Sequence, residues 1–75
     1  MDFLSLKKGE QARIVSLNKL DSVYRHKLIA MGLLPGTPFS VSRIAPFGDP
    51  IEIKVRDVTL SLRKSEANLI HIENV

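Results

Sequence analysis

Alternation between apolar and polar residues dominates the second half of the chain. Ile51-Glu52-Ile53-Lys54-Val55-Arg56 alternates strictly, and the residues from Thr59 to Arg63 repeat the pattern with leucines. A period of two is typical of strands that bury one face. The stretch 39–44 alternates less regularly, with Phe39 and Val41 on one side and Ile44 on the other. We expect antiparallel strands over 39–44, 51–56 and 59–63, joined by a hairpin connection at 45–50 and a short turn at 57–58.

The pattern between residues 21 and 32 has the period of a helix instead. Tyr24, Leu28 and Met31 recur at the spacing of one helical face, which we expect to be buried. Asp21 or Ser22 offers the N-cap side chain. Gly32 stands where a C-cap glycine is expected, because the left-handed conformation costs other residues about 1–2 kcal/mol. The sequence therefore predicts one helix that ends at Gly32.

Two weaker strands and a helical turn complete the expected elements. The strands cover 11–17 and 70–73, and Lys64–Leu69 is typical of a single helical turn. Five short strands, each with one buried face, leave open edges unless the sheet curls. The sequence thus predicts a mainly β fold, a small SH3-like five-stranded barrel with one inserted helix and a short C-terminal helical turn, in one domain over residues 1–75. An OB-like barrel is the competing architecture.

Composition excludes several classes of site. The chain has 75 residues, a net charge of +3 and no cysteine, so disulfides and thiolate metal sites are absent. The two histidines, His26 and His71, are far apart and show no metal-ligand spacing, although a weak metal site shared between chains stays open. No motif indicates catalysis or nucleotide binding, so we expect no enzyme activity, no cofactor and no high-affinity metal site in one chain. No apolar run approaches the length of a membrane helix.

Nucleic acid is an alternative ligand because small basic barrels often bind it. A single-strand platform needs aromatic side chains interleaved with basic ones on one sheet face. The chain has four aromatic residues, of which Phe39 and Tyr24 have core spacing and Phe47 is the remaining candidate for exposure. We therefore expect no nucleic acid partner. Self-association through the edge strand around His71 is a further alternative.

A protein contact is the function class that remains, and it centres on the turn after the helix. Pro35 and Gly36 predict a second turn directly after Gly32. The favoured interpretation packs Leu33 against Leu28, places Leu34 in the core and folds Phe47 over the barrel mouth. The alternative is that such side chains are exposed anchors of an interface. The candidate partner-binding residues are Leu28, Met31, Gly32, Leu33, Leu34, Pro35, Gly36 and Phe47.

The residues around this turn resemble a known family. Tyr24-Arg25-His26-Lys27-Leu28-Ile29-Ala30-Met31-Gly32-Leu33-Leu34-Pro35-Gly36 is similar to the helix-to-turn motif of the ferrous iron transport protein A family, FeoA. Ala45-Pro46-Phe47-Gly48-Asp49-Pro50-Ile51 resembles the hairpin of that family, and Arg63-Lys64 agrees with its final turn. Order, spacing and length match across essentially the whole chain.

The resemblance implies a small cytosolic SH3-like barrel that acts with FeoB, a ferrous iron permease with a cytosolic GTP-binding domain. It implies a contact with the cytosolic side of FeoB, at the inner face of the cell membrane. The resemblance leaves open whether the role is assembly of the transporter, activation of GTP hydrolysis or iron sensing. The simplest activation mechanism lacks an arginine finger that spacing identifies, although Arg25 and Arg43 are present. Direct iron sensing is disfavoured by the few candidate ligands.

Overall fold

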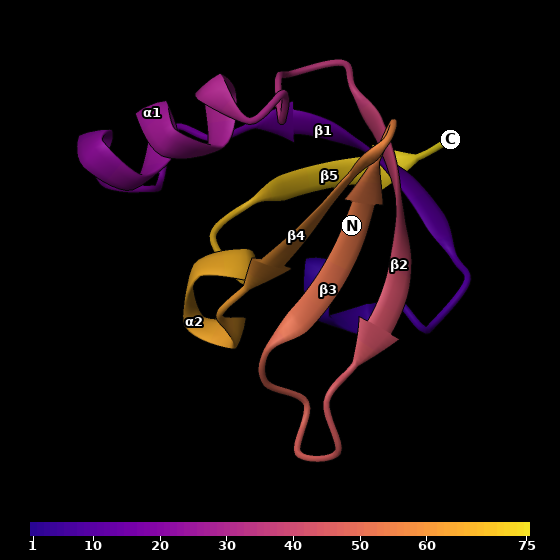
Figure 1. Cartoon of the computed structure of the whole chain (residues 1–75). Coiled ribbons are helices and arrows are strands. Elements are labelled where there is room, and N and C mark those ends of the chain that lie inside the picture. Colours follow the sequence, from indigo (N-terminus) through magenta and orange to yellow (C-terminus); the bar gives the residue numbers. More distant parts are fainter.

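Five antiparallel strands form one curled sheet in a computed structural model that describes residues 1–75 (Figure 1). The sheet order is β4-β3-β2-β1-β5. The strands are β1 (Gln11–Ser16), β2 (Pro38–Ile44), β3 (Ile51–Val55), β4 (Val58–Leu62) and β5 (His71–Asn74). The helices are α1 (Ser22–Ala30), α2 (Lys64–Ala67) and the N-terminal 3₁₀ turn η1 (Phe3–Ser5). This arrangement confirms the predicted mainly β SH3-like fold with an inserted helix.

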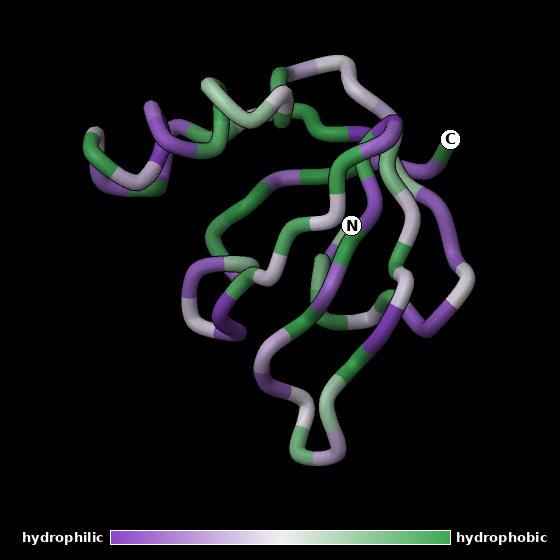
Figure 2. Tube along the Cα trace, viewed as in Figure 1, coloured by the Kyte–Doolittle hydropathy of each residue, from purple (hydrophilic) through white to green (hydrophobic).

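One core connects both ends of the sheet, which is why the sheet curls. Apolar side chains of β4, such as Leu60 and Leu62, lie in the same buried cluster as Ile70 and Ile72 beside and within β5. The edge strands carry buried residues on one face only, so curling brings those faces together. Figure 2 shows the resulting alternation of hydrophobic and hydrophilic positions along the strands.

The regular part of the sheet follows the predicted alternation. Ile51, Ile53 and Val55 of β3 are buried. In β3's pairing with β4, Ile53 lies opposite Leu60, and Val55 lies opposite Val58 across the two-residue turn. Both strands present their apolar residues to the same side of the sheet. The pairing therefore buries Leu60 together with the three apolar residues of β3, and Val58 beside the turn is exposed.

A bulge in β2 overturns the predicted position of Ile44. The register between β2 and β3 shifts between Val41 and Arg43, where Ser42 donates its hydroxyl to the backbone oxygen of Glu52 at 3.1 Å. An extra residue in one strand reverses the alternation beyond it. Ile44 consequently packs against the core, whereas the preceding Arg43 is exposed.

The N-terminal segment contributes to the core, a role that the sequence pattern did not predict. Phe3 is buried and its ring stacks on Phe39 with 5.3 Å between centroids. Asp2 caps η1 by accepting a hydrogen bond from the backbone N–H of Leu4. The segment before β1 therefore closes one side of the curled sheet.

Candidate functional site

The end of α1 has the predicted Schellman geometry. Gly32 has φ +97°, its N–H donates to the oxygen of Ile29 at 3.0 Å, and the N–H of Leu33 donates to the oxygen of Leu28 at 3.0 Å. These are the two hydrogen bonds that define the motif. Leu28 and Leu33 both belong to the buried core, so their predicted contribution to one apolar cluster at the helix end is confirmed.

A second tight turn follows directly. Leu34 accepts a hydrogen bond from the N–H of Thr37 at 3.0 Å, with Pro35 and Gly36 between them and Gly36 at φ +88°. Pro followed by a residue of positive φ is the geometry of a type II turn. Gly36 and Thr37 then hydrogen-bond to Ile14 of β1. The backbone from residue 32 to residue 37 is thus fixed at both ends.

This rigid backbone exposes side chains that the sequence assigned to the core. Leu34 is 44% exposed and Met31 is 40% exposed, so the predictions that Leu34 lies in the core and that Met31 lies on a buried face are wrong. Met31 is the C-cap residue, where the chain leaves the helix. Leu34 begins the turn on the outside, because the neighbouring Leu33 occupies the core at 0% exposure.

The exposed face of α1 continues this apolar turn. Val23, Lys27 and Met31 are four residues apart, so they lie along one side of the helix, and all three are exposed. We call Val23, Lys27, Met31, Leu34 and Pro35 the α1-turn surface. No acidic residue occurs from residue 22 to residue 48. The surface is therefore apolar with cationic neighbours.

The opposite face of α1 attaches the helix to the body of the protein. Leu28 is the only buried residue of the helix, and Figure 1 shows α1 extending beyond the sheet. Asp21 is the N-cap, accepting from the N–H of Tyr24 at 3.0 Å. Burial raises the pKa of the Tyr24 hydroxyl above its ordinary value, and the Glu66 carboxylate raises it further while Arg63 opposes the shift. Tyr24 is partly buried and packs against the core beside Leu28 of the same helix face.

Phe47 does not join this surface. It is 95% exposed at the tip of the β2–β3 hairpin, so the prediction that it folds over the barrel mouth is wrong. The α1-turn surface precedes β2 and the hairpin follows it, and a seven-residue strand spans roughly 23 Å. Figure 1 shows the two features at opposite ends of the molecule. Seven of the eight candidate residues therefore lie together at the end of α1 and in the turn that follows, where Leu28 and Leu33 are buried. The eighth, Phe47, lies apart from them.

The hairpin that carries Phe47 is itself well anchored. The N–H of Ala45 donates to the oxygen of Pro50 at 3.1 Å, and the N–H of Gly48 donates to the oxygen of Ala45 at 2.7 Å. At the base of the hairpin, Asp49 accepts from the N–H of Lys64 at the start of α2 at 3.0 Å. The hairpin is thus a second ordered feature with an exposed apolar side chain.

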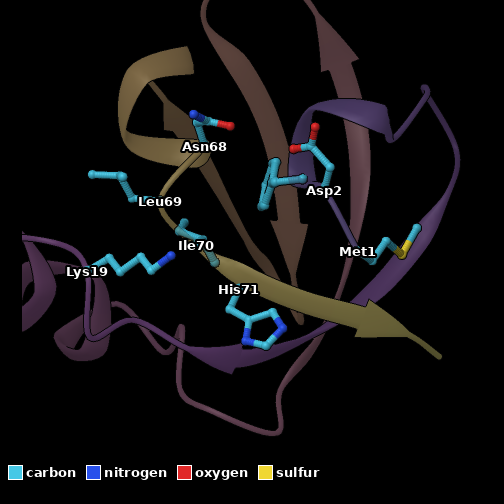
Figure 3. A pocket seen from close by; sticks show the side chains of 8 residues that line it. Met1, Asp2, Lys19, Asn68, Leu69, Ile70 and His71 are labelled. Carbon is cyan, nitrogen blue, oxygen red and sulfur yellow. The ribbon is translucent and has the colours of Figure 1, made fainter.

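A small open pocket lies between the N-terminal segment and the connection from α2 to β5. Its volume is about 160 Å³, and Lys19 and His71 line one side of it while Asp2 and Asn68 lie on the other (Figure 3). No group of three or more His, Cys, Asp or Glu side chains in the structure has the arrangement of a metal site. His26 and His71 are both exposed, as the sequence predicts. No helix has the length and apolar composition needed to span a bilayer.

Comparison with known proteins identifies the family. The model of the FeoA domain matches residues 1–74. The chain belongs to the FeoA family. It is 33% identical over 73 residues to an Fe(2+) transport protein A/Fe(2+) transporter FeoB fusion protein of Porphyromonas gingivalis. That match covers 97% of this chain and 8% of the fusion protein.

Solved structures of FeoA proteins share the fold over the whole chain. The solution structure of FeoA from Chlorobium tepidum is 33% identical with a TM-score of 0.93, and the match covers 100% of this chain and 70% of that one. Iron(II) transport protein A from Clostridium thermocellum is 39% identical with a TM-score of 0.88, covering 100% of this chain and 46% of that one. The FeoA family consists of small accessory domains associated with ferrous iron transport, and it is not a known family of enzymes.

Proposed function

We propose that this FeoA chain is an accessory protein of ferrous iron uptake that binds the FeoB transporter through the α1-turn surface. The observation that carries the proposal is the exposure of Met31 and Leu34 on a backbone fixed by two tight turns. Binding to such a surface orders few additional groups, which keeps the entropic cost of association low. The buried residues Leu28 and Leu33 support the surface from below, and Gly32 and Gly36 permit its backbone geometry.

The relative from Porphyromonas gingivalis supports FeoB as the partner. In that protein a FeoA sequence and FeoB are parts of one chain, so the two are held at high effective concentration. A separate FeoA chain needs a contact surface to reach the same association. We propose that the contact is on the cytosolic side of FeoB, at the inner face of the cell membrane.

Charge indicates what the contacted surface of FeoB is like. The α1-turn surface combines apolar side chains with Lys27, and the segment 22–48 contains no acidic residue. Complementary potentials favour a partner whose apolar centre is surrounded by carboxylates. Arg25 is half-buried and donates to the oxygen of Leu20 at 3.4 Å, so it helps to hold α1. We therefore propose a docking role rather than insertion of Arg25 into the GTP site.

The double substitution Met31→Gln and Leu34→Gln is expected to weaken binding to FeoB about 30- to 100-fold. Each substitution is expected to remove about 1 kcal/mol or more of binding free energy, because the exposed part of the apolar side chain is no longer buried at the interface. Because both side chains already contact water, the melting temperature should change little. Isothermal titration of purified FeoB from the same organism into each variant measures the affinity.

Phe47→Ser is the matched control, since it removes a larger exposed apolar side chain at the other end of the molecule. We expect its affinity to stay within about twofold of the wild type. Strong binding by the folded double variant, together with loss of binding in Phe47→Ser, would move the contact to the hairpin. Failure of the wild-type chain to bind FeoB would reject the proposed partner.

A further inference from the structure

Strand β4 ends the sheet with a free edge. It pairs with β3 on one side only, and no strand pairs with its other side. Val58, Thr59 and Ser61 are exposed, whereas Leu60 and Leu62 point into the core. Figure 1 shows β4 beside β3, with α2 following directly at the end of β4.

The hairpin geometry identifies which backbone groups face outward. Val55 and Val58 pair across the two-residue turn, and such a closing pair is hydrogen-bonded. Alternation along the ladder makes Leu60 and Leu62 the next hydrogen-bonded positions of β4. The N–H and C=O groups of Thr59 and Ser61 therefore point away from β3. None of these groups takes part in a hydrogen bond outside the ladder.

This edge lacks the features that normally prevent strands from pairing. Proteins protect free edges with charged side chains, prolines or bulges. Strand β4 has none of these, because its exposed side chains are Val58, Thr59 and Ser61 and its register with β3 is regular. The other edge strand, β5, is shorter and exposes His71 and Glu73. Strand β4 is thus the better template for an additional strand.

We infer that β4 pairs antiparallel with β4 of a second copy of this chain, around a two-fold axis at Leu60. In this register Thr59 lies opposite Ser61 of the partner subunit, which creates two outward-facing residue pairs that together form four backbone hydrogen bonds. Asp57 lies in the turn directly before β4 and Arg63 directly follows β4 with an extended backbone, so this register brings these residues of opposite charge to the same end of the paired strands twice. The edge is self-complementary in both hydrogen bonding and charge, as a two-fold interface requires.

Registers centred on the neighbouring residues lack this charge complementarity. An axis at Thr59 places Asp57 opposite Ser61 of the partner subunit, and an axis at Ser61 places Arg63 opposite Thr59 of the partner subunit. The α1-turn surface includes no residue of β4, so pairing through β4 does not use that surface. The second copy is therefore the occupant that the sequence of the edge itself specifies.

Sedimentation equilibrium over a series from about 10 µM to about 1 mM tests the pairing, because an interface this small forms a weak dimer. Asp57→Arg is expected to raise the dissociation constant about tenfold by placing like charges opposite each other. The double variant Asp57→Arg with Arg63→Asp restores the opposite charges, so its dissociation constant should be within about threefold of the wild-type value. Glu73→Arg on β5 makes the same change in net charge and should have no effect.

Amide hydrogen exchange gives a second readout that a general electrostatic effect would not change. The N–H groups of Thr59 and Ser61 should exchange fast in dilute protein and become protected as the dimer forms. A monomer at every concentration would overturn the inference. So would an assembly larger than a dimer, which would indicate that β4 pairs with β5 of another copy, or equal weakening by Glu73→Arg and Asp57→Arg.

Discussion

Leu33→Ala is expected to lower the free energy of unfolding by about 3–4 kcal/mol, a large share of the stability of a chain this short. Leu33 is fully buried at the point where α1 ends and the chain turns toward β2. The substitution leaves a cavity between Leu28 and the strands. It keeps the backbone hydrogen bond from residue 33 to Leu28, so the loss measures side-chain packing.

Urea denaturation of two neighbouring variants separates packing from backbone strain. Gly32→Ala should cost about 1–2 kcal/mol, because a Cβ there meets no atom within 4 Å and only the positive φ opposes it. Leu34→Ala should cost less than about 1 kcal/mol, since that side chain already contacts water. Equal costs for Leu33→Ala and Leu34→Ala would contradict the assignment of the two leucines.

Phe3→Ala is expected to destabilise the protein by about 3–5 kcal/mol. Its ring is buried and stacks on Phe39 of β2 with 9° between the ring planes. The loss of this ring opens the side of the core that the N-terminal segment closes. Thermal unfolding followed by circular dichroism should show a lower melting temperature for Phe3→Ala.

The same substitution at Phe47 supplies the control within one chain. Phe47→Ala removes an aromatic ring that is almost fully exposed, so its melting temperature should match that of the wild type. A similar loss of stability in both variants would show that the N-terminal segment does not pack as the structure describes.

Local rules were sufficient for most of the elements of the fold. The alternation of Ile51, Ile53 and Val55 predicts β3 because both the pairing and the burial depend on a period of two. Gly32 predicts the end of α1 for a similarly local reason, since few other residues adopt its backbone conformation at low cost. The count of five one-faced strands then predicted an SH3-like barrel, because curling removes the open edges of such a sheet.

The wrong predictions depend on contacts between distant residues. The bulge at Ser42 involves Glu52, ten positions away, and it turns Ile44 toward the core. The ring of Phe3 is buried against the stacked ring of Phe39, and no periodicity within residues 1–9 indicates that contact. A short sequence window includes only one residue of each such pair, so its pattern cannot indicate the contact.

The turn after α1 was predicted in position, but the exposure of its side chains was not. The sequence located the turn from Gly32 to Gly36 but assigned both Leu33 and Leu34 to the core. Two adjacent leucines in a tight turn cannot both point inward, and the hydrogen bond from Leu33 to Leu28 decides which one does. Phe47 was grouped with the turn because both were candidates for an exposed apolar contact, although the strand predicted over 39–44 already separates them along the chain.

The most direct test of the central claim is a nuclear magnetic resonance titration of ¹⁵N-labelled chain with FeoB from the same organism. We expect the largest changes in amide signals along the exposed side of α1 and from Met31 to Gly36, while the signals of the hairpin from Ala45 to Pro50 stay unchanged. Changes centred on the hairpin, or a spectrum that FeoB leaves unchanged, would contradict the proposed docking surface.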